Sequence, residues 1–314
     1  MALTIGIDVG GTKVAAGVVD EDGTIVEHLR RPTPAQEPEK VAEVIADVVR
    51  ELSGRHPVDA VGLGAAGFVD ETRSVLRFAP NLAWREEPLR KKVGELIDLP
   101  IVVENDANAM AWGEYRFGAA RGESHVVCVT VGTGIGGGLV LDGRLYRGRW
   151  GMGAEWGHMQ VVPGGRPCGC GNRGCWERYA SGSALVMDVR DAIAADPARG
   201  ARLLELAGGS LENAEGEVVA EAARAGDEVA LEAFALLARW LGQGLADLAA
   251  ILDPGCFVIG GGVSHSADLF FDAAREEYTR RVVGRGHRPL ADIRIAELGP
   301  SAGLVGAADL ARLG

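Results

Sequence analysis

The sequence has little positive charge relative to its negative charge. Its 32 lysine and arginine residues stand against 44 aspartate and glutamate residues, so the formal net charge is −12 over 314 residues. A protein that binds nucleic acid needs a clustered basic face, and the one basic cluster, residues 280–288, is short. We therefore expect no nucleic-acid partner.

Long apolar runs and linkers are also missing. No run approaches the roughly 18 apolar residues of a membrane-spanning helix, and Met1 leads directly into a strand pattern rather than into a charged and then apolar leader. We expect no membrane partner and a cytoplasmic location. The chain has no low-complexity linker, and its length and hydrophobic content of 47% suit two compact α/β domains.

Cysteine is scarce, but three of the five cysteines lie close together. Cys168, Cys170 and Cys175 follow His158 in a glycine-rich segment. Three thiolates and one imidazole are typical of a structural zinc site with tetrahedral geometry. Disulfides are the alternative, although a bridge between Cys168 and Cys170 would be strained. The other two cysteines lie in apolar runs and are expected in the core.

Hydrophobic periodicity predicts an α/β chain that opens with consecutive antiparallel strands. Strands are expected at residues 3–9, 14–19, 24–31, 58–65, 101–104, 256–259 and 293–298. Helices are expected at residues 40–52, 89–97, 107–117, 182–194, 218–224, 227–252, 267–282 and 302–313. Residues 77–88, which include Pro80, Asn81 and Leu82, are expected to form a loop.

The opening of the chain recurs. Residues 126–142 match residues 4–20 at a constant offset, in the order strand, glycine turn, strand and Asp-Gly turn. This self-similarity predicts two domains built on one duplicated three-stranded unit. The alternative is that two unrelated sheets share glycine hairpins, because turn chemistry alone favours glycine there.

Each copy of the repeat carries a candidate phosphate-binding turn. Asp8 ends a buried strand, and Gly10, Gly11 and Thr12 then offer backbone amides and a hydroxyl to an anion. Asp8 would face Mg²⁺ bound to nucleotide phosphates, through water. The second copy offers Gly132, Thr133 and Gly134. The alternative for each is a plain hairpin turn.

Two nucleotide-binding patterns are excluded. Gly132, Gly134 and Gly137 match G-x-G-x-x-G. A dinucleotide-binding turn must open a helix, however, and residues 136–141 read as a strand. The chain also contains no G-x-x-x-x-G-K-[ST] sequence, which excludes the P-loop class.

Asn105 and Asp106 stand between a predicted strand and a predicted helix. A carboxylate there would be held ionised by the helix N-terminus, and the amide of Asn105 can both donate to and accept from a sugar hydroxyl. Asp106 is thus a candidate general base. The alternative is that both residues only cap the helix.

Glu155 and Glu177 bracket the cysteine-rich segment. If zinc binds one ring nitrogen of His158, the other can donate to a sugar hydroxyl. Two carboxylates and one imidazole would then hold a polyol. The alternative is that the glutamates only orient the zinc ligands.

Taken together, these motifs resemble the ROK family (repressors, open reading frames and kinases) from Ile5 to the end of the chain. The segments that carry the resemblance are Asp-Val-Gly-Gly-Thr-Lys at 8–13, Glu-Asn-Asp-Ala-Asn at 104–108, Val-Gly-Thr-Gly-Ile-Gly-Gly-Gly at 131–138, Glu-Trp-Gly-His at 155–158, and the cysteine motifs at 168–171 and 174–177. Within the family the chain resembles the actinobacterial-type glucokinases.

The resemblance implies a two-domain α/β fold of the actin/hexokinase/Hsp70-like ATPase (ribonuclease H-like) type with an inserted zinc loop. It implies a first domain of residues 1–120 plus 300–314 and a second of residues 121–299. It also implies that Asp106 takes the proton from the sugar 6-hydroxyl. The implied sugar-binding residues are Gly67, Asn105, Asp106, Glu155, His158 and Glu177. The implied ATP-binding residues are Asp8, Gly10, Gly11, Thr12, Lys13, Thr133, Gly134, Gly261 and Gly262.

The expected activity is transfer of phosphate from ATP, with Mg²⁺, to the 6-hydroxyl of glucose. Three alternatives stay open: a kinase for N-acetylmannosamine, N-acetylglucosamine or fructose, a polyphosphate-dependent enzyme, and an actin-like ATPase without sugar kinase activity. The family's repressors carry a DNA-binding domain ahead of the first motif, which begins here at Asp8, so we do not expect a repressor. A homo-oligomer, dimer or tetramer, is expected.

Overall fold

The computed structural model describes residues 3–79 and 84–314, and the chain folds into two compact units. Unit 1 comprises Met1–Cys128, Gly137–Ala154 and Ala296–Gly314, and unit 2 comprises Val129–Gly136 and Glu155–Ile295. The predicted domain limits differ mainly in residues 137–154, which lie in unit 1 here. The predicted division into domains stays a prediction.

A five-stranded sheet with the order β3-β2-β1-β4-β8 forms the centre of unit 1. Its strands are β1 (Leu3–Val9), β2 (Lys13–Val19), β3 (Ile25–Pro32), β4 (Val58–Ala65) and β8 (Ile101–Asn105). The predicted antiparallel opening is confirmed, because β2 pairs antiparallel with both β1 and β3. β1, β4 and β8 run parallel, so their carboxyl ends meet at one edge of the sheet.

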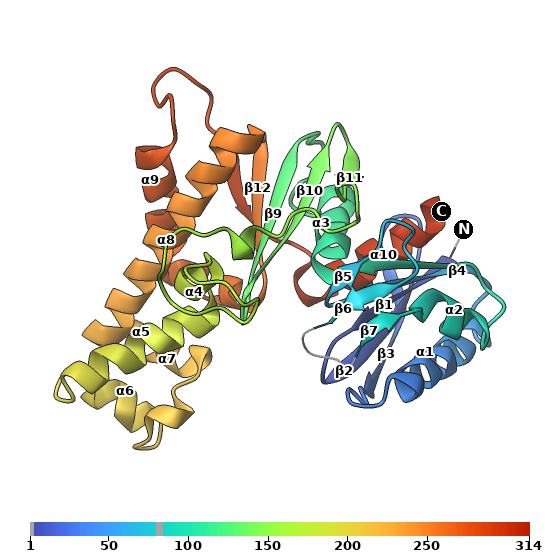
Figure 1. The fold of residues 1–314 in the computed structure, drawn as a ribbon, viewed down its shortest axis with the longest axis horizontal. Coiled ribbons are helices and arrows are strands. Elements are labelled where there is room, and N and C mark those ends of the chain that lie inside the picture. The colour runs from blue at the N-terminus through green and yellow to red at the C-terminus, as the bar shows by residue number, and fades with distance from the viewer. Residues whose placement is uncertain (1–2, 80–83) are drawn as a thin grey trace. The chain divides into compact units, whose positions relative to one another are not determined.

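Helices cover both faces of this sheet (Figure 1). α1 (Pro38–Ser53) packs its apolar side against one face, where Ile5 and Ile7 of β1 are fully buried. α3 (Asp106–Phe117) and α10 (Ala302–Leu313) lie on the other face. Gly6 contacts α10 so closely that a Cβ atom there would lie 1.9 Å from the carbonyl oxygen of Leu304. Successive residues of β1 point to opposite faces of the sheet. One face therefore carries the apolar side chains of the core, and the other contacts the backbone of α10 closely.

The predicted loop at residues 77–88 is wrong at both ends. β6 (Leu76–Phe78) pairs antiparallel with β5 (Phe68–Val69) and β7 (Arg85–Glu87), and α2 (Leu89–Gly94) follows. Strands of two or three residues are too short to show an alternating pattern. Pro80, Asn81 and Leu82 lie outside the described residues.

The second five-stranded sheet has the order β11-β10-β9-β12-β13. Its strands are β9 (Val126–Val131), β10 (Ile135–Leu141), β11 (Arg144–Tyr146), β12 (Cys256–Gly260) and β13 (Asp292–Ile295). In both sheets the order is the third, second, first, fourth and fifth strand of the sheet along the chain. This common order agrees with the duplication that the sequence predicts.

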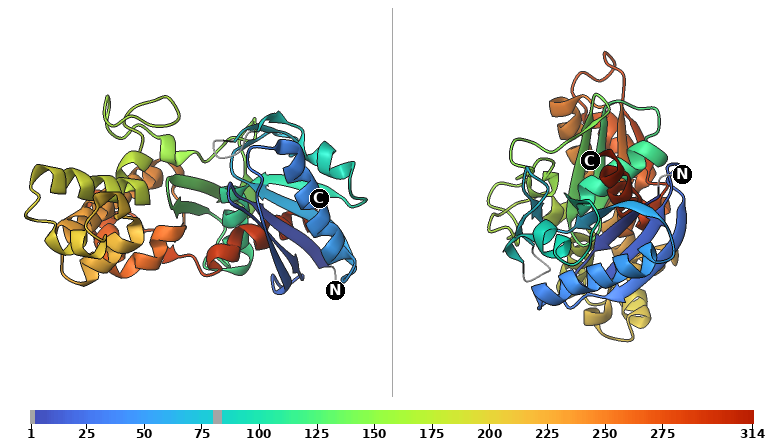
Figure 2. Two further views of the ribbon diagram at one scale, coloured as in Figure 1. Left: turned by 90° about the horizontal axis from the view of Figure 1, so that it is seen from below. Right: turned by 90° about the vertical axis from the view of Figure 1, so that its right-hand side faces the viewer.

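Helices form most of unit 2, as Figure 2 shows. α8 (Glu228–Leu252) packs against α5 (Gly182–Ala195), α7 (Gly216–Arg224) and α9 (Phe271–Arg281). α6 (Ala201–Leu206) was not predicted. The predicted helix at residues 267–282 is wrong in its first turn, because a 3₁₀ helix, η3 (Gly262–Leu269), precedes α9 and Phe270 is not helical.

α8 also corrects the expectation about apolar runs. It is 25 residues long, and by length and composition alone it is apolar enough to span a membrane. Half of its most apolar window is buried inside the protein. A core helix has the same properties, and the predictions about membrane and cytoplasm stay predictions.

Candidate functional site

The carboxyl edge of the first sheet gathers four of the predicted site residues in unit 1. Register places Asp8 of β1 opposite Gly64 of β4, and Ala65 of β4 opposite Asn105 of β8. Gly67 follows β4, and Asp106 follows β8 as the first residue of α3. Ligand sites in α/β proteins form outside the carboxyl ends of parallel strands.

Asn105 is the N-cap of α3, and its predicted contact with a sugar stays a prediction. Its Oδ1 accepts a hydrogen bond from the backbone N–H of Asn108 at 3.0 Å, and its Nδ2 donates to the carbonyl oxygen of Gly67 at 3.1 Å. Gly67 has φ +144°, and a Cβ atom there would lie 2.4 Å from the carbonyl oxygen of Phe78. The orientation of the Asn105 amide therefore depends on a position that favours glycine.

Asp106 is left with one uncommitted carboxylate oxygen. Its Oδ1 accepts from the backbone N–H of Ala107 at 2.9 Å, and Oδ2 makes no hydrogen bond to the residues that the structure describes. Burial raises the pKa of Asp106, although the N–H of Ala107 acts in the opposite direction. The sequence shows only the helix N-terminus, which favours the ionised carboxylate, and burial acts against it. A carboxylate with a raised pKa is a stronger proton acceptor.

Asp8 lies near Asp106, and each carboxylate is partly buried. Burial, and to a smaller extent the charge of Asp106, raise the pKa of Asp8 to about 6 against the opposing charge of Lys13. Two neighbouring carboxylates are a donor set that suits a hard divalent cation such as Mg²⁺. The structure thus brings together a candidate base and a candidate metal ligand.

The first predicted phosphate turn connects β1 and β2. The N–H of Gly10 donates to the carbonyl oxygen of Lys13 at 3.0 Å, and the hydroxyl of Thr33 donates to the carbonyl oxygen of Gly10 at 2.8 Å. Gly11 is partly exposed, while Thr12 and Lys13 are exposed. Hydrogen bonds within the protein thus fix one side of the turn, and its other side is exposed, as an anion-binding site requires.

The second predicted phosphate turn lies in unit 2. The N–H of Gly132 donates to the carbonyl oxygen of Gly134 at 3.0 Å, and the N–H of Gly182 donates to the carbonyl oxygen of Gly132 at 2.8 Å. Thr133 is exposed at the tip of the turn. The last of these bonds joins the turn to the start of α5.

A pocket of about 850 Å³ opens beside this turn, and we name it the α5 pocket. Its lining includes Gly132, Thr133 and Gly262, together with residues of α5 and α7. The neighbouring Gly261 has φ +84°, and a Cβ atom there would lie 2.5 Å from the carbonyl oxygen of Val131. Only glycine fits at this position, which lets the chain leave β12 beside the pocket. The volume suits a small-molecule ligand.

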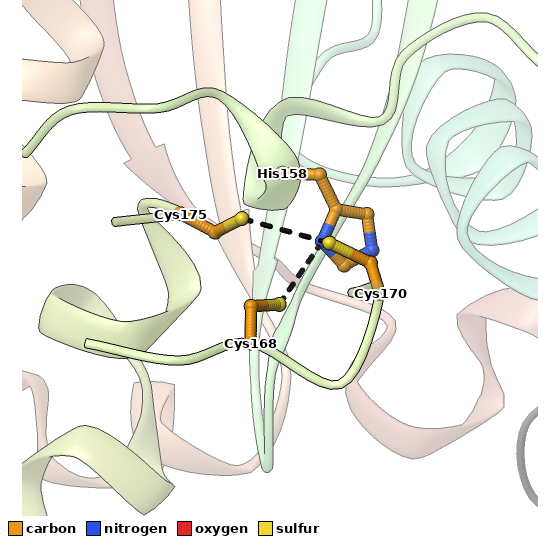
Figure 3. A group of neighbouring side chains, drawn as sticks. All are labelled: His158, Cys168, Cys170 and Cys175. Carbon is orange, nitrogen blue, oxygen red and sulfur yellow. Dashed lines mark hydrogen bonds between the residues drawn. The ribbon is translucent and has the colours of Figure 1, made fainter. Parts of the chain in front are cut away.

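The predicted zinc ligands meet in unit 2. The ligand atoms of His158, Cys168, Cys170 and Cys175 all lie within 4.8 Å of one another, and Figure 3 shows the four side chains pointing toward a common centre. Sγ of Cys170 and Sγ of Cys175 are 3.7 Å apart, as are Sγ of Cys168 and Nδ1 of His158. Ligands bound at ~2.3 Å in a tetrahedron lie roughly 3.8 Å apart. The four donors therefore fit a zinc ion.

Disulfides are not formed in this cluster. All three cysteines are free, and a separation of 3.7 Å exceeds the roughly 2.05 Å of a sulfur–sulfur bond. Burial raises the pKa of the Cys168 thiol, which donates to Oε1 of Glu177 at 3.0 Å.

Glu177 adjoins both the cysteine cluster and the second turn. Its Oε1 contacts Cys168, and its Oε2 lies 2.5 Å from the position that a Cβ atom at Gly134 would occupy. Nδ1 of His158 faces the cluster, so Nε2 is the nitrogen left for another partner. The backbone N–H of His158 donates to the carbonyl oxygen of Glu155 at 3.1 Å, which places Glu155 at the start of the same 3₁₀ turn.

One residue that the sequence analysis missed connects the cysteine-rich segment to α5. Nη2 of Arg166 lies 2.5 Å from Oδ1 of Asp188, and Nη1 donates to the carbonyl oxygen of Arg178 at 3.1 Å. The guanidinium also lies over the ring of Tyr179, 5.2 Å from its centroid. No spacing in the sequence indicates these contacts.

A second missed group supports the candidate base. Glu104 is buried, and its carboxylate lies 2.7 Å from Nε of Arg147 and 3.1 Å from Nε of Arg73. Glu104 also accepts from the backbone N–H of Asn105 at 2.9 Å and from Nδ2 of Asn108 at 3.1 Å. The two arginines compensate the buried charge directly beneath the Asn105-Asp106 turn.

Comparison with known proteins identifies the family of the chain. The sequence matches the model of the ROK family over residues 4–313. A glucokinase of Streptomyces coelicolor is 52% identical over 312 residues, which cover 99% of this chain and 98% of that protein. The crystal structure of a ROK family glucokinase from Streptomyces griseus in complex with glucose and AMPPNP is 53% identical and matches with a TM-score of 0.90 over 100% of both chains.

A ROK hexokinase from Thermus thermophilus is 39% identical, and its structure matches with a TM-score of 0.84 over 99% of this chain and 98% of that one. The predicted actin/hexokinase-like α/β fold is thereby confirmed. The matches extend over nearly all of the chain, and their range contains the segments that carried the resemblance. The chain belongs to the ROK family.

Proposed function

We propose that this protein is a glucokinase that transfers phosphate from ATP to the 6-hydroxyl of glucose, giving glucose 6-phosphate and ADP. One observation carries the proposal. The Streptomyces griseus glucokinase, which binds glucose and AMPPNP, matches this chain at 53% identity over its full length. The Streptomyces coelicolor relative has the same name. The candidate site contains the groups that such a reaction needs.

Asp106 is the proposed general base. The uncommitted oxygen of Asp106 would accept the proton of the sugar 6-hydroxyl, while the hydroxyl oxygen attacks the terminal phosphorus of ATP and ADP leaves. Burial raises the pKa of Asp106, which makes its carboxylate a stronger proton acceptor. Asn105, with its amide oriented by Gly67, would hold a neighbouring sugar hydroxyl. Because phosphoryl transfer requires positioning more than covalent chemistry, this rigid support favours catalysis.

Glu155, His158 and Glu177 are the proposed sugar-binding residues of unit 2. Two carboxylates accept hydrogen bonds from hydroxyls, and Nε2 of His158 would donate one. His158, Cys168, Cys170 and Cys175 would hold zinc, which supplies structural cross-linking of the segment when bound. Four protein ligands leave no open coordination position, so we assign the ion no part in the chemistry.

The phosphoryl donor would bind to the two glycine turns. Gly10, Gly11, Thr12 and Lys13 are proposed for the phosphates in unit 1. Thr133 and Gly134 are proposed for them in unit 2, and Gly261 and Gly262 for the adenosine. Asp8 would hold Mg²⁺ through water. When bound, Mg²⁺ neutralises charge on the donor phosphates.

A coupled assay of ADP release tests this function. The donor is ATP with Mg²⁺, the acceptors are glucose, mannose, fructose, N-acetylglucosamine and N-acetylmannosamine, and polyphosphate replaces ATP in a parallel arm. We expect turnover of glucose with ATP, and a kcat roughly 10²–10⁴-fold lower in Asp106→Asn, which keeps the shape of the side chain but cannot accept the proton. Asp98→Asn, at an exposed position, is the matched control.

The assay separates the alternatives. Preference for an N-acetyl sugar would contradict glucose as the substrate but keep the base. Full activity of Asp106→Asn would contradict the mechanism. Absence of turnover on every sugar, with ATP hydrolysis retained, would favour the actin-like ATPase. The cytoplasmic location and the homo-oligomeric state, dimer or tetramer, stay predictions from the sequence.

A further inference from the structure

The α5 pocket contains an arginine without a carboxylate partner. Arg178 belongs to the short helix α4 (Glu177–Ala180) and lines the pocket. Its Nη2 lies 3.8 Å from Sδ of Met187, another lining residue, so the guanidinium lies at the pocket wall. Its Nε is buried and has no hydrogen-bond partner among the described residues.

Three charged groups of α5 are engaged elsewhere. Asp188 of α5 binds Arg166 at 2.5 Å, and Asp191 lies 3.7 Å from the same guanidinium. Arg190 donates from Nε and Nη2 to the carbonyl oxygens of Leu211 and Glu212, at 3.0 and 3.1 Å. In the part of the chain that the structure describes, Arg178 forms no ion pair.

A partly buried guanidinium without a partner is unfavourable until an anion arrives. Its planar set of five donors matches phosphate oxygens in pairs, and such charge-assisted bonds are stronger than neutral ones. The anion that the proposed function brings into this pocket is the nucleotide. Arg178 therefore has no anionic partner among the described residues, and the phosphates of the nucleotide would provide one.

Position indicates which part of the nucleotide Arg178 meets. The preceding residue, Glu177, has its carboxylate against Gly134 of the phosphate turn. The N–H of Gly182, shortly after α4, donates to the carbonyl oxygen of Gly132. α4 thus lies at the end of the α5 pocket where the phosphate turn opens. Given the proposed function, we propose that Arg178 binds the phosphate chain of the nucleotide donor.

Binding measurements on the whole chain test the assignment. Wild type, Arg178→Gln and Arg178→Lys are titrated calorimetrically with AMPPNP, with adenosine and with inorganic tripolyphosphate. Loss of charged hydrogen bonds predicts that Arg178→Gln weakens AMPPNP binding about 10- to 100-fold. Adenosine binding stays unchanged, tripolyphosphate binding weakens, and Arg178→Lys restores part of the AMPPNP affinity. Arg239→Gln, at an exposed position of α8, is the matched control with wild-type affinity.

Kinetics give a second measurement. Arg178→Gln raises KM for ATP by a similar factor and leaves KM for glucose unchanged. An unchanged AMPPNP affinity would overturn the proposal. Equal losses of affinity for AMPPNP and adenosine would also overturn it, because they would place the guanidinium against the adenine ring or reveal a distorted pocket. Wild-type protein that neither binds AMPPNP nor forms ADP would overturn the proposed function itself, whereas normal wild-type activity with an unaffected variant overturns only the role of Arg178.

Discussion

The carboxylate of Glu177 lies against the backbone of Gly134. A Cβ atom at Gly134 would be 2.5 Å from Oε2 of Glu177, while Oε1 accepts from Sγ of Cys168 at 3.0 Å. One side chain thus contacts both the second glycine turn and the cysteine cluster. In the proposed enzyme this contact joins a phosphate-binding element to a sugar-binding residue.

Gly134→Ala should therefore weaken glucose binding. The added methyl group displaces the Glu177 carboxylate, and the loss of a charged hydrogen bond to the sugar predicts an increase in KM for glucose of about 10-fold or more. Steady-state kinetics with glucose as the varied substrate measure the effect. The matched control is Gly94→Ala in α2, where a Cβ atom meets only Cδ1 of Ile101 at 3.7 Å. Equal KM values for Gly134→Ala and wild type would contradict the prediction.

Asp8→Asn should stabilise the protein at neutral pH and inactivate it. The folded pKa of Asp8 is about 6 and its ordinary value is 3.8. A folded state that retains the proton more tightly than the unfolded state is destabilised as pH rises from about 4 to about 6, and this effect is constant at higher pH. Removal of the ionisable group should add on the order of 1–3 kcal/mol to the free energy of unfolding above pH 6, and much less near pH 4.

Denaturant unfolding at pH 4.5 and pH 8 measures this difference. Asp98→Asn, exposed after α2, serves as the control and should show the same change at both values. An Asp8→Asn variant that is less stable than wild type at pH 8 would disprove the unfavourable burial of the Asp8 charge. Its kinase activity should be lost at every pH, since the proposed magnesium ligand is gone.

Strand ends and local spacing explain what could be predicted from the sequence. Asp8, Asn105 and Asp106 were predictable because each directly follows a run of buried strand residues, and parallel strands bring such ends together. The cluster of His158 with three cysteines was predictable because all its ligands lie within one short segment. In both cases the information is local in the chain.

Long-range partners could not be predicted. Arg166 and Asp188 are separated by 22 residues and Glu114 and Leu298 by 184, and neither pair leaves a periodic pattern. The burial that raises the pKa of Asp106 could not be predicted for a related reason. Burial of that carboxylate depends on tertiary packing, whereas the helix N-terminus is visible in the sequence.

Zinc binding should depend on Cys170 and not on the cysteines of the core. Metal analysis of the purified protein should find about one zinc per chain, because the four ligands form one tetrahedral set. Cys170→Ser should lower the zinc content and the melting temperature, since the segment has few apolar residues to hold it. Cys128→Ala, at a buried position of β9, is the control and should keep its zinc. Full zinc content in Cys170→Ser would contradict the assigned ligand set.

Glu114 should contribute strongly to the stability of unit 1. The side chain is fully buried, and Oε2 accepts from the backbone N–H groups of Ala119 and Glu297 at 2.9 and 3.0 Å, while Oε1 accepts from that of Leu298 at 2.8 Å. The bonds to Glu297 and Leu298 join the end of α3 to the segment through which the chain returns to unit 1 before α10. Gly118 permits them, because a Cβ atom there would lie 2.1 Å from Oε2 of Glu114.

Glu114→Gln replaces one accepting oxygen with an amide group that cannot accept, so at least one of the three N–H groups loses its partner. We expect the free energy of unfolding to fall by about 2–4 kcal/mol. Equilibrium unfolding in urea measures the loss. Glu95→Gln is the control, because its ion pair with Lys91 is long, at 3.9 Å, and exposed, and such pairs contribute about 0.5 kcal/mol or less. If the two variants lost equal stability, the bonds of Glu114 to Glu297 and Leu298 would not be what holds the returning segment to α3.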